Sequence, residues 1–187
     1  MSKEAILEAA AQIIREKGYH AASMADIANA VDLSKATLYS HIDSKQAILV
    51  ALLDQALETL IEDIQPVLTA NVPADEKFRR AMHAFLSYMS ENLDLSAVLL
   101  LEHRSLDPEK RGEHIPRRDE YESYWRQIIE EGVAEGIFTV EDPSLSAKVA
   151  LGVASWTVMW FNPQGRLSAE QIADQSADIL LEGFYKR

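Results

Sequence analysis

Glycine and proline are scarce in this chain, and apolar residues recur at spacings of three and four along nearly all of it. Only 7 Gly and 6 Pro occur among 187 residues. Apolar side chains at that spacing share one face of an α-helix, whereas a half-buried strand needs strict alternation, which no segment shows convincingly. The sequence therefore predicts an all-α fold with short connections.

Serines mark the predicted starts of the first three helices. Ser2, Ser23 and Ser34 each precede an apolar stripe, where a hydroxyl can accept a hydrogen bond from a first-turn N–H group. A fourth helix runs to Pro66, and its twenty or so residues at ~1.5 Å each give roughly 30 Å, enough to join two subdomains. Further prolines divide the rest of the chain into predicted helices at 74–93, 95–106, 109–136, 144–161 and 168–184.

Residues 23–45 place two short helices around the tight turn Val31-Asp32-Leu33. This spacing predicts a helix-turn-helix, whose second helix enters the major groove of DNA. We therefore expect a three-helix DNA-binding domain at residues 1–47 and a helical second domain at residues 48–187.

The charge distribution supports that assignment. The chain carries a net charge of −12, of which the first fifty residues hold only −1. With Leu38 and Ile42 buried, the outward positions of the second helix carry no carboxylate, although the rest of the chain is strongly acidic. These outward positions are Lys35, Ala36, Thr37, Tyr39, Ser40 and His41.

Lys45 lies in the first turn of the fourth helix, where a cation opposes the helix dipole. A DNA phosphate at that helix N-terminus would reverse the sign of the interaction. The alternative is a solvated lysine at an ordinary three-helix corner. The combination with Tyr39 and His41 favours the phosphate contact.

Other functional classes lack a sequence signal. The chain has no cysteine, and its histidines show neither metal-ligand nor catalytic-triad spacing; the best catalytic candidates, His83 and the pair Glu102-His103, have no orienting partner. We therefore expect no metal, no cofactor and no enzyme activity. Glu4 and Glu8 interrupt any signal-peptide core, and no apolar stretch is long enough to span a membrane, so the expected location is the cytoplasm.

The second domain is rich in aromatic residues and methionine, which can form a plain core or line a ligand cavity. The segment 103–118 adds a cluster of basic residues, which indicates either an anionic partner or a salt-bridged surface. The predicted ligand-binding residues are expected to point inward or to supply positive charge. They are Met82, Phe85, Met89, His103, Arg104, Arg117, Arg118, Tyr121, Tyr124, Trp125, Trp156 and Trp160.

The stretch from Asp26-Ile27-Ala28 through Leu38-Tyr39-Ser40-His41 to Ser44-Lys45 resembles the DNA-binding signature of the TetR family of transcriptional regulators. Two positions depart from the family pattern: Asp32 stands where Gly is usual, and Ile42 stands where Phe is usual. The resemblance implies that Lys35, Ala36 and Thr37 approach bases. It implies phosphate contacts for Ser23, Ser34, Tyr39, Ser40, His41 and Lys45.

The runs RRDEYESYWRQIIEEGVAEGIF and GVASWTVMWFNPQGRLSAEQIAD resemble TetR members that respond to acyl-coenzyme A thioesters in fatty-acid or sterol catabolism. The resemblance implies a homodimer that binds a palindromic DNA operator, represses transcription and is released by a small hydrophobic or acyl-CoA-type effector. It also implies that the last two helices form the dimer interface, although they could equally close the monomer's core. A drug-responsive efflux-type repressor and a helical interaction module without DNA stay open as alternatives.

Overall fold

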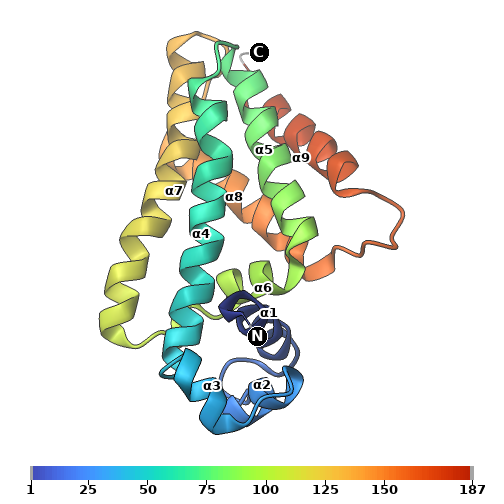
Figure 1. The fold of residues 1–187 in the computed structure, drawn as a ribbon. Coiled ribbons are helices and arrows are strands. Elements are labelled where there is room, and N and C mark those ends of the chain that lie inside the picture. The colour runs from blue at the N-terminus through green and yellow to red at the C-terminus, as the bar shows by residue number, and fades with distance from the viewer. Residues whose placement is uncertain (1, 186–187) are drawn as a thin grey trace. The chain divides into compact units, whose positions relative to one another are not determined.

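The computed structural model describes residues 2–185, and within them it confirms the predicted all-α fold (Figure 1). Nine α-helices and one short 3-10 helix, η1, follow one another along this part of the chain. They are α1 (Lys3–Lys17), α2 (Met24–Ala30), α3 (Lys35–His41), α4 (Lys45–Thr69), α5 (Ala74–Glu91), α6 (Leu93–Leu101), η1 (His103–Ser105), α7 (Pro108–Ala134), α8 (Pro143–Trp160) and α9 (Ala169–Phe184).

These elements form two compact units. The first contains the described residues through Glu58 together with Asn92–Pro116, and the second contains Thr59–Glu91 and the described residues from Arg117 onward. The helices α4 and α7 each run through both units. The division therefore differs from the predicted boundary at residue 47, because α6 and the start of α7 pack with the N-terminal helices.

The predicted serine caps are present. The Oγ of Ser2 accepts a hydrogen bond from the N–H of Ala5 at 3.3 Å, and the Ser23 and Ser34 hydroxyls cap α2 and α3 in the same way. Gly18 ends α1 with a backbone φ of 78°, a conformation that residues with a Cβ atom rarely adopt. Local hydrogen bonding thus sets the beginnings of the first three helices.

The fourth helix is longer than predicted. Its first turn is capped by Ser44, whose Oγ accepts from the N–H of Ala47 at 3.0 Å. The prediction that the helix ends at Pro66 is wrong, since α4 continues to Thr69. Pro66 lies in the last exposed turn, where few helical hydrogen bonds remain to be lost, and the Thr69 hydroxyl donates to the carbonyl of Gln65 at 3.2 Å.

The sixth predicted helix, 95–106, also needs correction. The α-helix covers Leu93–Leu101 and is followed by η1 instead of continuing. Its C-cap residue Glu102 leaves helical geometry, and the chain then turns toward Leu106, which is buried in the first unit. Burial of Leu106 favours this break over a longer helix.

The core of the first unit comes from both of its chain segments. Ile6, Ile27 and Leu38 of the first three helices are fully buried, and Val98 of α6 and Leu106 belong to the same hydrophobic cluster. A core of this kind stabilises by roughly 25 cal/mol per Å² of apolar surface removed from water. The helix-turn-helix is therefore stabilised in part by residues that lie much further along the chain.

Aromatic rings fill the second unit. Phe78 of α5 contacts Trp125 of α7 and Phe184 of α9 edge to face, with ring centroids 5.7 and 5.5 Å apart. Phe138 joins the cluster against Phe184, with ring centroids 5.8 Å apart, and Gly132 leaves room for it, because a Cβ at position 132 would lie 2.1 Å from Cδ2 of Phe138. The ring cluster holds α5, α7 and α9 together.

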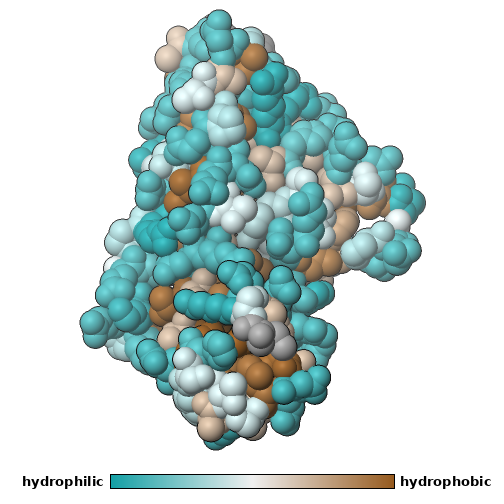
Figure 2. Space-filling view, in the orientation of Figure 1, coloured by the Kyte–Doolittle hydropathy of each residue, from teal (hydrophilic) through white to brown (hydrophobic). Residues whose placement is uncertain are grey.

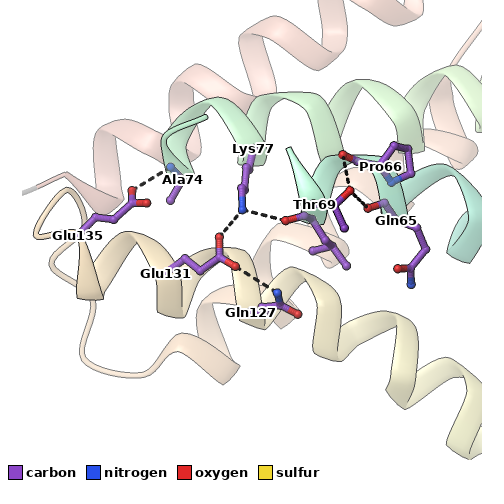
Figure 3. A network of polar contacts seen from close by, with 9 residues as sticks. Gln65, Pro66, Thr69, Ala74, Lys77, Gln127, Glu131 and Glu135 are labelled. Carbon is purple, nitrogen blue, oxygen red and sulfur yellow. Dashed lines mark hydrogen bonds and ion pairs between the residues drawn. The ribbon is translucent and has the colours of Figure 1, made fainter. Parts of the chain in front are cut away.

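A polar network joins three helices of the second unit (Figure 3). The Nζ of Lys77, on a largely buried side chain, donates to the carbonyl of Leu68 at 2.8 Å and to Oε2 of Glu131 at 2.7 Å. Burial alone would raise the pKa of Glu131, but hydrogen bonds from Lys77 and Gln127 lower it below its ordinary value. Lys77 thereby satisfies a carbonyl at the end of α4 that the helix leaves without a partner.

Candidate DNA-binding surface and ligand-binding core

Two short helices and a tight turn hold the predicted DNA-binding surface. In α2 a full capping box is present, with Ser23 N–H donating to the carboxylate of Asp26 at 2.9 Å and Asp26 N–H donating to Ser23 Oγ at 3.1 Å. Asp32 then adopts φ 53, a left-handed conformation that Asp tolerates better than most residues. This geometry confirms the helix-turn-helix predicted from the sequence.

The outward face of α3 is as the sequence predicted. Leu38 is fully buried and Ile42 is nearly so. The first turn of α3 contains no acidic residue. The six predicted outward positions are all exposed: Lys35, Ala36, Thr37, Tyr39, Ser40 and His41.

Several hydroxyls on this surface already make local hydrogen bonds. The Oγ of Ser34 accepts from Thr37 N–H at 3.0 Å and lies 2.7 Å from Thr37 Oγ1. Ser40 Oγ donates to the carbonyl of Thr37 at 2.6 Å. These bonds fix the side-chain rotamers at the start of α3, and each hydroxyl oxygen can still accept a further hydrogen bond.

The ammonium of Lys45, in the first turn of α4, makes its hydrogen bonds within the protein. Its Nζ donates to three backbone carbonyls of the connection between α1 and α2, those of Tyr19 at 2.7 Å, Ala22 at 2.8 Å and His20 at 3.3 Å. It also lies 4.4 Å from the centroid of the Tyr19 ring, within reach of a cation–π interaction. An ammonium has three N–H donors, so these carbonyls use all of them.

Five of the predicted ligand-binding residues lie together in the core of the second unit. Phe85 stacks on Tyr121 with centroids 6.4 Å apart and meets Trp125 edge to face at 6.3 Å. Met82 and Met89 of α5 are buried as well. The indole of Trp125 is fully buried and interacts with the hydroxyl of Tyr121. The structure thus brings five of the predicted residues together in one apolar cluster.

Two buried tyrosines add polar groups to this core. Burial raises the pKa of Tyr121 well above its ordinary value, although the nearby indole of Trp125 opposes the shift. Burial, and then the carboxylate of Asp63, raise the pKa of Tyr88 in the same direction. Both phenols are therefore neutral at physiological pH. Tyr88 was not among the predicted ligand-binding residues; its position one turn after Phe85 on α5 is the signal that could have found it.

The expectation that Trp156 and Trp160 point inward is wrong. Trp156 is 65% exposed and Trp160 is 54% exposed, whereas the small residues Ala147, Ala150 and Ala154 form the buried face of α8. Small residues allow close helix packing, so the larger side chains are left outside. We call the exposed large apolar side chains of α8 and α9 the apolar stripe. It comprises Leu145, Val149, Val153, Trp156, Met159 and Trp160 of α8 and Ile179 of α9.

The predicted cationic contacts are spread over both units. His103 and Arg104 belong to η1 in the first unit, and Arg117 and Arg118 begin the part of α7 that belongs to the second. Arg104 and Arg118 are exposed. Tyr124, further along α7, donates its hydroxyl to Glu120 at 2.7 Å.

Part of the basic cluster is paired locally. Lys110 forms an ion pair with Glu113 at 2.9 Å, and the guanidinium of Arg111 donates to the carbonyls of Arg104 and Leu106.

Across residues 2–185 no group of three or more His, Asp or Glu side chains is arranged to hold a metal ion. Nor does any helix in this range have the length and hydropathy needed to cross a membrane. On the face drawn in Figure 2, hydrophilic residues cover most of the surface.

Comparison with known families settles the class of protein. Residues 6–52 match the family described as bacterial regulatory proteins of the tetR family, and residues 71–184 match the tetracyclin repressor-like C-terminal domain. The chain belongs to the TetR family. A TetR-family protein is a ligand-responsive, DNA-binding transcriptional regulator and not an enzyme, as the sequence predicted.

Solved structures and relatives agree with this assignment. The TetR-family regulator PfmR from Thermus thermophilus is 37% identical, with a TM-score of 0.88 over 95% of this chain and 97% of that one. AibR, solved in complex with isovaleryl coenzyme A and operator DNA, is 30% identical, with a TM-score of 0.87 and the same coverage. The transcriptional repressor KstR2 of Rhodococcus jostii (strain RHA1) is 26% identical over 184 residues, which is 95% of this chain and 88% of the relative.

Proposed function

We propose that this TetR-family regulator is a homodimeric repressor that binds a palindromic operator in the cytoplasm and is released by a hydrophobic or acyl-coenzyme A ligand. The observation that carries the DNA-binding part is the face of α3. It is exposed, it lies in a capped helix-turn-helix, and it has no carboxylate in a chain of net charge −12. Phosphates repel acidic proteins, so a surface without acid is where contact costs least.

In this proposal the first turn of α3 reads bases and its flanks contact phosphates. Lys35, Ala36 and Thr37 reach the major groove. Ser23, Ser34, Tyr39, Ser40 and His41 contact phosphate oxygens. To donate to a phosphate, the hydroxyl of Ser23 turns away from Asp26 and that of Ser40 turns away from the carbonyl of Thr37. For Lys45 the three carbonyl contacts favour a supporting role, in which the ammonium fixes the connection between α1 and α2 beneath these residues.

The test begins with selection of the operator from random duplex DNA, followed by fluorescence anisotropy on variants. Thr37→Ala should change the preferred bases, whereas Tyr39→Phe should weaken binding to all duplexes alike, because a phosphate contact carries no sequence information. Tyr185→Phe, a matched change on a residue whose hydroxyl lies 3.3 Å from Asp75, should leave both properties unaltered. If neither α3 variant differs from the wild-type protein, the proposed DNA surface is wrong.

For the ligand, the buried aromatic cluster of Phe85, Tyr121 and Trp125 suits an apolar acyl chain. AibR, a relative with 30% identity, was solved with isovaleryl coenzyme A. We propose that Arg117 and Arg118, which belong to the same unit as this cluster, contribute contacts to the phosphates of a coenzyme A thioester. Arginine suits phosphate because its planar group donates two parallel hydrogen bonds.

A thermal-shift series separates the ligand classes, because only a ligand that binds the native protein raises the unfolding midpoint. Isovaleryl coenzyme A and longer acyl thioesters should raise the midpoint more than free coenzyme A or the free acids do. Stabilisation by lipophilic cations alone would support the drug-responsive repressor instead. In either case the operator experiment stands by itself.

The exposed apolar stripe on α8 and α9 is the proposed dimer interface. Monomeric proteins seldom leave so many large apolar side chains of one surface in water. Pairing two copies of the stripe would bury Trp156, Trp160 and Ile179 against their counterparts. A dimer also provides two recognition helices, which a palindromic operator requires about one DNA turn apart, roughly 34–36 Å.

A further inference from the structure

The connection between α6 and α7, residues 102–107, is bonded to the helix-turn-helix side of the first unit through two polar side chains. Gln46 uses both atoms of its amide on this connection. Its Nε2 donates to the carbonyl of Ser105 at 2.8 Å, and its Oε1 accepts from the N–H of Asp107 at 3.3 Å. One side chain on the first turn of α4 thus forms hydrogen bonds to the backbone on both sides of Leu106.

Glu102 makes the second link. Its Oε1 accepts from the backbone N–H of Tyr19 at 3.1 Å, and its Oε2 accepts from Ser105 Oγ at 2.9 Å. The carbonyl of the same Tyr19 accepts from Lys45 Nζ at 2.7 Å. A continuous series of hydrogen bonds therefore runs from the end of α6 through the α1–α2 connection to the start of α4, four residues after α3 ends at His41.

The hydrogen-bonded residues of this series come from two different family domains. Residues 102–107 lie inside the matched C-terminal family domain, 71–184, whereas Tyr19, Lys45 and Gln46 lie inside the matched DNA-binding domain, 6–52. All of them nonetheless pack in one compact unit. The bonds join the two functional domains of the regulator at a place that touches neither the outward face of α3 nor the aromatic core.

We propose that Gln46 and Glu102 are positioning residues that couple the ligand state of the C-terminal domain to the position of α3. This inference rests on the proposed ligand response of the protein. Hydrogen bonds weaken steeply when their length or angle departs from the optimum, so a shift of about 1 Å in α6 breaks this series instead of stretching it. The segment then has two distinct arrangements, which is what an allosteric signal needs.

By thermodynamic linkage the coupling acts in both directions, so operator DNA alone can reveal it. The test compares hydrogen exchange in peptides that span residues 102–107 with and without the selected operator duplex. In the wild-type protein, operator binding should slow this exchange by about tenfold, because it holds the coupled arrangement. Gln46→Met, which keeps the length of the side chain and removes both hydrogen bonds, should reduce the effect to below about twofold.

Two controls make this result specific. Gln12→Met removes the amide of an exposed glutamine on α1 whose partner is Glu16, and it should behave as the wild-type protein does. Glu102→Met should lose the coupling as Gln46→Met does, whereas Glu102→Gln should retain it. The amide that the second substitution introduces could still accept from Tyr19 N–H and could donate to Ser105 Oγ.

Operator affinity decides between coupling and contact. Gln46→Met should bind the operator within about threefold of the wild-type protein, and any ligand-induced loss of operator affinity should shrink at least about fivefold, a typical lower size for allosteric coupling. If both Gln46→Met and Glu102→Met keep the operator-linked protection, the inference is overturned. It is equally overturned if Gln46→Met loses operator affinity by more than about tenfold while the protection persists, since Gln46 would then be a DNA contact.

A failure of the ligand proposal is distinguishable from a failure of this one. If isovaleryl coenzyme A and its longer homologues leave the wild-type midpoint unchanged, the thioester assignment fails. The exchange experiment uses no ligand, so its outcome still supports or overturns the coupling through Gln46 and Glu102.

Discussion

At the scale of single residues, Ser96 on α6 has a buried hydroxyl that makes no hydrogen bond to the described residues. Its side chain is 1% exposed, and its Oγ has no hydrogen-bond partner among the described residues. A buried hydroxyl that makes no hydrogen bond costs its desolvation free energy. We expect Ser96→Ala to raise the free energy of unfolding by about 1 kcal/mol, measured by urea denaturation.

The matched control for this change is Ser87→Ala on α5. Ser87 is exposed and donates to Glu91 at 3.0 Å, so its replacement should change the free energy of unfolding by less than about 0.5 kcal/mol. A loss of stability in Ser96→Ala would contradict the prediction and would point to an ordered water bonded to the hydroxyl.

The lowered pKa of Asp26 predicts how its contribution to stability changes at low pH. Hydrogen bonds from Lys17 and Ser23 hold the pKa of this carboxyl well below its ordinary value. Because the folded pKa is the lower one, the stabilisation is complete above the ordinary pKa of about 3.9 and is lost as the pH falls through the folded value. NMR titration of the Asp26 carboxyl should show the lowered midpoint, and Lys17→Met should move that midpoint upward. An unchanged midpoint would assign the shift to the capping box alone.

At the scale of elements, the apolar stripe of α8 predicts how the subunits associate. Val153 lies in the middle of the stripe and is 43% exposed, so Val153→Glu adds a charge to the proposed interface without entering the monomer core. We expect sedimentation velocity to show monomers and anisotropy to show weaker operator binding, because a buried unpaired carboxylate costs several kcal/mol. Circular dichroism should stay unchanged.

Gln164→Glu is the control for this experiment, since residue 164 lies in the exposed connection between α8 and α9 and makes the same change of charge. A dimer of Val153→Glu as tight as that of the wild-type protein would show that the subunits pair through another surface.

Elements also show how far the sequence can be interpreted on its own. Caps such as Ser23 and Ser34 were predictable because their partners lie three residues away. The end of α4 was not, because a proline in the last turn removes few helical hydrogen bonds and the helix continues to Thr69. The orientation of Trp156 was missed for another reason: α8 is apolar on two faces, and periodicity cannot tell which of them faces the core.

The exposed residues of the DNA-binding surface could be predicted from the sequence, whereas the hydrogen bonds that hold the surrounding segments in place could not. The outward positions of α3 follow from helical periodicity once Leu38 is buried. The contacts of Lys45 and Gln46 join positions 23 to 61 residues apart, and no local pattern indicates them. The hydrogen bonds by which Lys45 and Gln46 hold distant segments together are therefore visible only in the structure.

At the scale of the whole molecule, charge governs how the protein meets DNA. The net charge of −12 is concentrated after residue 50, so association depends on few cations. We expect Lys35→Ala to weaken binding to the selected operator and to relax the base preference at one position, because its ammonium is proposed to approach bases; anisotropy on the operator and its single-base variants measures both. Lys3→Ala, a matched change on exposed α1, should leave both properties unaltered. A base preference that is equal in Lys35→Ala and the wild-type protein would mean that Lys35 reads no base.

The discontinuous first unit has a consequence for how such regulators can be recombined. Val98 and Leu106 complete the core around Ile27 and Leu38, although they lie far beyond the helix-turn-helix in the chain. A chimera that joins residues 1–58 of this protein to the effector domain of a relative would replace part of that core with foreign side chains. Exchange of operator specificity between relatives is therefore expected to need residues 92–116 as part of the transplant, so the heritable module for DNA recognition consists of two separate stretches of the gene.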